Sequence, residues 1–146
     1  MNDSNHIEPF YPSWLTIAQK ELGVSEIKGS KHNDRILEYH EATTLRATED
    51  EVPWCSSFIV WCMEQAGQGS TKSAAARSWL KYGSELKVPA FCCIAVLSRG
   101  SNPKSGHVGF IVHEGKDKIL LLGGNQGDKV SIASFKKSRV ISYRWP

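Results

Sequence analysis

The sequence predicts an α+β fold in which N-terminal helices pack on a C-terminal antiparallel sheet of about five strands. Up to about residue 88, apolar residues recur at helical spacing. Beyond it, short apolar or alternating runs are separated by clusters of Gly, Asn, Pro, Asp and Lys at hairpin lengths. Helices that come first and a meander that follows favour α+β over a doubly wound parallel sheet.

Four segments before residue 88 have helical periodicity, and each has a start or stop signal. The predicted helices span residues 13–23, 33–43, 53–67 and 73–83. Ser13 and Asn33 are expected to cap the first two, and Pro53 opens the third. Gly67 ends the third and Gly83 the fourth, because glycine favours the residue after a helix.

Five later segments are predicted to be strands. They are residues 91–98, 107–115, 118–126, 129–135 and 140–145. The turns between them are short, which indicates antiparallel neighbours.

Length and charge predict a single domain. The 146 residues suit one catalytic domain over 1–146, with 1–12 a loosely ordered N-terminal segment. The net charge of +3 comes from dispersed residues, which disfavours a nucleic-acid groove. No apolar run approaches the roughly 20 residues that span a bilayer, and the N-terminus lacks a signal-peptide pattern. We expect synthesis in the cytoplasm and no stable membrane association.

The cysteines are expected to be free thiols. Cys55 and Cys62 lie about 10 Å apart along one helix, too far for a disulfide. Cys92 and Cys93 are adjacent, and no pair has the usual zinc spacing. We therefore expect neither a metal nor another cofactor.

Cys55 is the candidate nucleophile. It follows Pro53 at the start of a helix, where the helix dipole and free N–H groups are expected to lower a thiol pKa. The alternative is an ordinary buried cysteine.

A base and an orienting group follow in the strand region. His107 stands at the mouth of a strand, where it is either a general base or an ordinary strand-end histidine. If residues 107–112 and 118–125 form a hairpin, Asn125 lies beside His107 and its carbonyl could orient the ring. Asn125 could instead serve only the turn, and Gln126 and Asp128 are alternative orienters.

The order and separation of three segments carry a resemblance: PWCSSFIVWCMEQAG, GHVGFIV and LGGNQGDKVSI. They resemble the papain-like peptidoglycan hydrolases of the NlpC-type and CHAP superfamily. A compact bacterial and phage branch shares WLTIAQKELGV, HNDRILEYH and SRVISYRWP, so the similarity covers about Trp14 to Pro146. Val112 departs from a Glu that CHAP members often carry, and Cys92 and Cys93 from a Gly-Asp pair.

The resemblance implies a papain-like fold and a cysteine amidase or endopeptidase acting on peptidoglycan through a thioester. Cys55 would attack, His107 would act as the base and Asn125 would orient it. Candidate substrate contacts are Trp54, Asp50, Glu51 and Gln126, although Trp54 could serve packing and the two acids could be solvated turn residues. The alternatives are an acyltransferase or deamidase acting on proteins, and a non-catalytic or zinc-binding module that uses Cys92 and Cys93.

We expect the protein to act in the periplasm or cell wall, and two delivery routes to that place are open. A contractile (type VI) secretion system would inject an antibacterial effector into a target cell, which would require a cognate immunity protein. A phage holin would instead release an endolysin.

Overall fold

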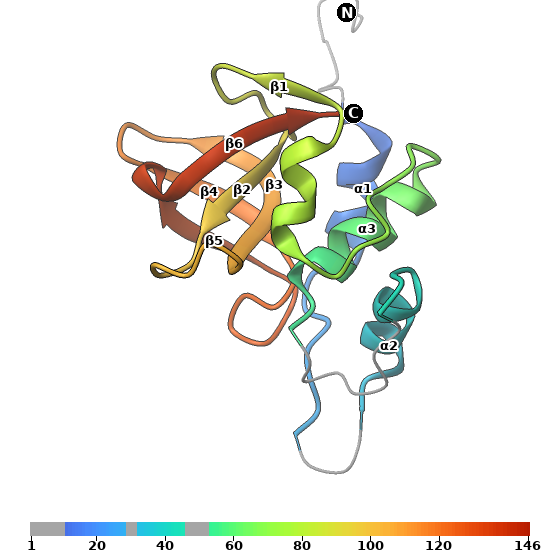
Figure 1. Cartoon of the computed structure of the whole chain (residues 1–146). Coiled ribbons are helices and arrows are strands. Elements are labelled where there is room, and N and C mark those ends of the chain that lie inside the picture. Colours follow the sequence, from blue (N-terminus) through green and yellow to red (C-terminus); the bar gives the residue numbers. More distant parts are fainter. Residues whose placement is uncertain (1–10, 29–31, 46–52) are drawn as a thin grey trace, which may run out of the picture.

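The fold consists of helices on one side of a six-stranded antiparallel sheet (Figure 1). The computed structural model describes residues 11–28, 32–45 and 53–146. The helices are α1 (Ser13–Lys20), α2 (Asp34–Glu41) and α3 (Cys55–Gln65), with 3-10 helices η2 (Ala76–Lys81) and η3 (Lys137–Arg139). The strands are β1 (Ser84–Leu86), β2 (Ile94–Ser98), β3 (Gly106–Glu114), β4 (Lys118–Gly123), β5 (Ser131–Lys136) and β6 (Val140–Trp145). The predicted α+β class is confirmed.

The helix starts agree only in part with the predicted caps. The side chain of Asn33 accepts a hydrogen bond from the Arg35 N–H at 2.9 Å, which confirms it as the N-cap of α2. The cap predicted at Ser13 is wrong, because α1 already begins at Ser13 and Pro12 is its N-cap. A proline suits this position, because its fixed φ is compatible with both the extended backbone before the helix and the helix itself. The fourth predicted helix forms as the 3-10 helix η2.

The sheet has one strand more than expected. Its order is β1-β6-β2-β3-β4-β5, and all neighbouring pairs are antiparallel. The additional strand, β1, has three residues, which is too short to produce a visible alternation in the sequence. The order leaves β1 and β5 at the two edges.

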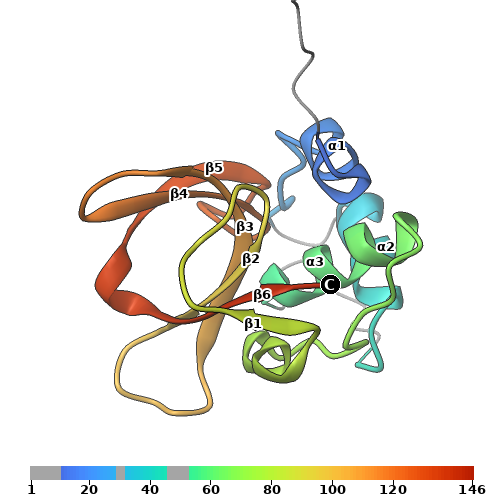
Figure 2. The same cartoon turned by 90° about the horizontal axis from the view of Figure 1, so that it is seen from above.

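Two apolar clusters bury both faces of the central strands. Ile94 and Val96 of β2 pack in the cluster shared with the helices, whereas Ala95 and Leu97 pack in a second cluster. This alternation is the period of a strand. Seen from above, the sheet curls away from the helices, which accounts for a second core on its other face (Figure 2).

No helix in the described part of the chain is both long and apolar enough to cross a bilayer. Residues 1–10 lie outside the described residues, so the predicted loosely ordered segment stays a prediction.

Candidate active site

Helix α3 presents Cys55 as its first residue, and a buried hydrogen-bond chain fixes that end of the helix. Trp79 of η2 donates from Nε1 to Ser56 Oγ at 2.9 Å. Ser56 Oγ in turn donates to the carbonyl of Ser73 at 2.7 Å. Because Ser56 follows Cys55, these two bonds hold the backbone on which the sulfur sits. The Cys55 side chain is 7% exposed.

Gly124 allows α3 to approach the sheet at this end. A Cβ at Gly124 would lie 2.7 Å from Phe58 Cβ and 2.8 Å from the ring of Trp54. Both distances are shorter than real Cβ contacts, so only glycine fits without displacing the helix. The close approach brings the start of α3 against the strands that carry the next site residues.

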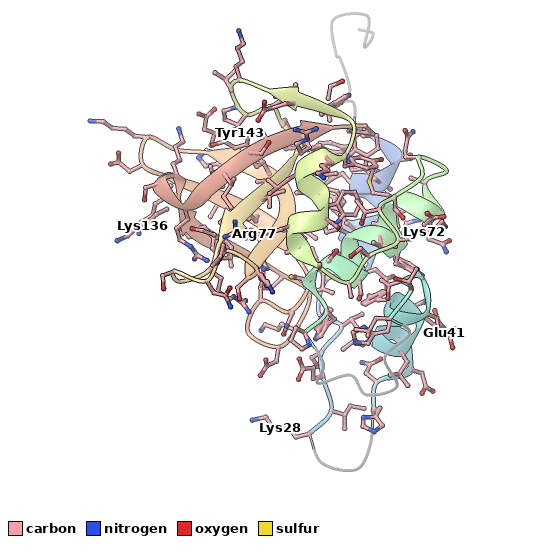
Figure 3. All side chains as sticks on the ribbon, viewed as in Figure 1. Lys28, Glu41, Lys72, Arg77, Lys136 and Tyr143 are labelled. Atoms are coloured by element: carbon pink, nitrogen blue, oxygen red, sulfur yellow. The ribbon has the colours of Figure 1, made fainter. Side chains whose placement is uncertain are left out.

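His107 is the second residue of β3 and is 2% exposed. The segment before it is anchored, since Arg77 donates from Nε to the Ser105 carbonyl at 2.6 Å. Figure 3 shows Arg77 where η2 meets the strands. A backbone hydrogen bond from Val108 reaches the sulfur of Cys55. The thiol therefore lies against the start of β3, beside the residue that follows His107.

Gln126 orients the imidazole. Its Oε1 lies 2.8 Å from His107 Nε2. Its Nε2 donates to the carbonyls of Leu121, at 3.1 Å, and Ser131, at 2.8 Å. Because the amide nitrogen of Gln126 donates to two carbonyls, its amide oxygen faces the ring. His107 Nε2 therefore carries the hydrogen that this oxygen accepts. His107 Nδ1 is then the basic nitrogen, and it is buried without a hydrogen-bond partner among the described residues.

Asn125, the predicted orienter, lies beside His107 but the described contacts give it no hydrogen bond to the ring. The β3–β4 pairs run from Glu114↔Ile119 to Phe110↔Leu122, and continuing this register would place Asn125 opposite His107. However, β4 ends at Gly123, and Asn125 adopts a φ of 58°. This left-handed residue turns the chain, so that the next side chain, Gln126, reaches the ring. The role given to Asn125 stays a prediction, whereas Gln126 has the contact that the role requires.

Burial shifts the pKa values of Cys55 and His107 towards their neutral forms. It raises the pKa of the Cys55 thiol above its ordinary value, although backbone hydrogen bonds from Val108 and Ser56 and the charge of Arg99 act in the opposite direction. The expectation of a low thiol pKa is therefore wrong, because desolvation exceeds the helix-terminus effect. Burial also lowers the pKa of His107 to about 4, against the hydrogen bond to Gln126.

Trp54 and Asp128, the remaining predicted residues that the structure describes, make contacts other than with the His107 ring. Trp54 is fully buried, stacks on Tyr39 and donates from Nε1 to Glu26 Oε2 at 2.8 Å, which supports the packing alternative. Asp50 and Glu51 lie outside the described residues. Asp128 lies in the turn with a φ of 61°, and its backbone carbonyl accepts from the Glu26 N–H.

A pocket of about 530 Å³ adjoins His107 on the side of the sheet. Arg99, Arg139 and Phe135 line it together with His107 and Gln126. The ring of Phe135 stacks on the imidazole, with centroids 5.1 Å apart. Sequence reasoning missed these three residues, because Arg99 and Arg139 are separated by forty positions and only the β2–β6 pairing brings their strand ends together.

The profile of the CHAP domain matches residues 47–125, more than half of the chain. The chain belongs to the CHAP domain family. CHAP domains have a papain-like fold and are typically amidases or endopeptidases that act on peptidoglycan. Cys55 and His107 fall within the matched residues, and Gln126 follows directly after them. Among curated proteins, no relative matches the chain.

The four cysteines of this CHAP domain are all buried free thiols. Among the described residues, no group of three or more His, Cys, Asp and Glu side chains is arranged to hold a metal ion. Cys92 has a φ of 72°, in the left-handed region that favours glycine.

Proposed function

We propose that this CHAP domain hydrolyses an amide bond in the peptide stem or crosslink of bacterial peptidoglycan, with Cys55 as nucleophile and His107 as base. The observation that carries the proposal is the free Nδ1 of His107. It is buried next to the residue whose backbone contacts the Cys55 sulfur, and its ring is held by Gln126. A buried imidazole nitrogen without a partner is costly, and such groups concentrate at functional sites.

The neutral pair defines how the first step proceeds. As the sulfur of Cys55 adds to the substrate carbonyl, its proton passes to His107 Nδ1, and no ion pair need exist beforehand. Negative charge develops on the carbonyl oxygen, where N–H groups at the start of α3 can stabilise it. Gln126 Oε1 accepts from Nε2 and stabilises the imidazolium that forms.

Two further steps complete the reaction. The imidazolium of His107 gives its proton to the leaving amine, the C–N bond breaks, and a thioester to Cys55 remains. His107 then removes a proton from water, which adds to the thioester carbonyl; the C–S bond breaks, and the imidazolium returns the proton to the leaving sulfur. The products are the free carboxylic acid and the regenerated thiol.

The test is digestion of isolated Gram-negative sacculi by the wild-type protein and by its Cys55→Ala variant, with the released fragments identified by mass spectrometry. We expect fragments from the wild type alone, and their masses name the bond. Matching folded-state circular dichroism of the two proteins is the control. Intact sacculi with both proteins would refute the proposal and favour the alternative of a protein substrate. A product joined to an added amine would instead indicate acyl transfer.

The substrate defines where such an enzyme acts, since peptidoglycan lies outside the cytoplasmic membrane. Delivery into the periplasm of a target cell as an effector, with a cognate immunity protein in the producer, stays a prediction beside release as a phage lysin. Growth arrest on periplasmic but not cytoplasmic expression in a Gram-negative host would support a periplasmic site of action.

A further inference from the structure

The pocket beside His107 carries positive charge, and no acidic side chain lines it among the described residues. Its lining includes Arg99 and Arg139 and the amides Asn125 and Gln126, and the described residues that line it include no Asp or Glu. The ion pairs that the described residues form lie elsewhere and use Arg35, Lys72 and Lys137 as their cations. Two guanidinium groups around a cavity without a carboxylate favour an anionic ligand.

Arg139 is held in place before any ligand arrives. Its Nε and Nη2 donate to the Ser98 carbonyl at 3.2 and 2.9 Å. Its guanidinium lies over the ring of Phe135, 5.4 Å from the centroid. Phe135 itself stacks on His107, so the cation, the ring and the imidazole form one layered group. The N–H groups of Nη1 have no acceptor among the described residues and remain available.

Arg99 approaches the same cavity from the end of β2 and is exposed. Its charge is close enough to both reacting groups to lower the pKa of Cys55 and that of His107. An anion bound by Arg99 therefore lies in the electrostatic surroundings of Cys55 and His107. The pocket is thus part of the reaction centre's surroundings and not a remote surface.

We propose that Arg99 and Arg139 bind a free carboxylate of the peptide stem next to the cleaved amide. This rests on the proposed function and names the substrate class of the same site. In stems where glutamate is linked through its side chain, the α-carboxylate stays free, and a guanidinium fork matches its geometry. A carboxylate there would also offset the repulsion that the two arginines exert on the imidazolium of His107.

The test compares two synthetic stem peptides that differ at one group. In the first the glutamate α-carboxylate is free, and in the second it is a carboxamide of the same shape. We expect wild-type kcat/KM to favour the carboxylate peptide by about 10- to 100-fold, the range for a charge-assisted hydrogen bond. We expect the preference to shrink towards one in Arg99→Gln and in Arg139→Gln, and to weaken with added salt.

Two variants control for charge and folding. Lys136→Gln removes a cation from an exposed side chain that is not among those lining the pocket, so the preference is expected to persist. Figure 3 shows the Lys136 side chain at the outer side of the sheet. Arg139→Lys keeps the charge and loses the fork, so an intermediate preference is expected. Arg99 is exposed, and its substitution leaves the apolar clusters intact.

Binding separates this proposal from the proposed function. Both peptides are titrated into the Cys55→Ala variant and followed by NMR, which needs no turnover. Tighter binding of the carboxylate peptide that is lost in Arg99→Gln supports the pocket even if the wild type cleaves neither peptide. Equal affinity for the two peptides, no binding of either, or a preference that survives both arginine substitutions would overturn it.

Discussion

Acid should destabilise the folded protein through His107. The pKa of the folded residue is about 4, against an ordinary value of 6.5. Between these values the unfolded chain binds a proton that the folded chain does not, so stability rises with pH in this window. The contribution is complete above about pH 6.5 and is lost as pH falls to about 4. The full loss of stability is about 3 kcal/mol, of which about 2 kcal/mol is already lost at pH 5.

The measurement is urea unfolding from pH 8 to pH 4.5, followed by fluorescence of the five tryptophans. The His107→Gln variant cannot titrate at this position, so other carboxylates and histidines cancel in the difference between the two proteins. We expect the stability advantage of the wild type over His107→Gln to fall by about 2 kcal/mol between pH 7.5 and pH 5. His113→Gln is the control, because His113 is exposed on the same strand. Parallel pH curves for wild type and His107→Gln would refute the reasoning.

Three further outcomes follow from the same contacts. Gln126→Glu places a carboxylate beside His107 Nε2 and raises the pKa of His107, so the acid limb of the kcat/KM pH profile should move up from about pH 4. Gln126→Ala removes the hydrogen bond and should lower kcat about 10- to 100-fold. Because the pKa of Cys55 is raised by burial, alkylation by iodoacetamide should be slow at pH 7 and accelerate above pH 9; a fast, pH-independent rate would indicate a preformed ion pair. Gly124→Ala should cost about 1–3 kcal/mol in urea unfolding, since its Cβ collides with the ring of Trp54.

Local patterns predicted the elements well because their signals lie within a few residues. Apolar spacing predicts the helix that carries Cys55. Continuous apolar runs after His107 and before Gly123 predict β3 and β4. The short strand β1 was not predicted, because three residues, two of them exposed, are too few to show an alternation. Ser13 misled for a similar reason, since any serine before an apolar stripe looks like a cap.

The sequence pointed to Cys55 and His107, whose catalytic roles stay a prediction, and it offered Gln126 only as an alternative orienter. Cys55 and His107 stand at element starts, which sequence patterns can locate. Whether Asn125 or Gln126 reaches the imidazole depends on one φ angle in the turn, and the register of the hairpin does not determine that angle. The direction of the Cys55 pKa depends on burial by residues far along the chain, and a helix-terminus argument does not include that cost.

Gln126 also ties the ring of His107 to an edge of the sheet. Its amide nitrogen bonds the carbonyls of Leu121 on β4 and Ser131 on β5, and β5 has no strand on its outer side. Edge elements open with less free energy than the global unfolding of a domain. When β5 detaches from β4, Gln126 loses its bond to Ser131, and the imidazole loses part of its support, whereas the cluster shared with the helices contains no residue of β5. Under the proposed function, activity should therefore disappear at denaturant concentrations where the tryptophans still report a folded protein.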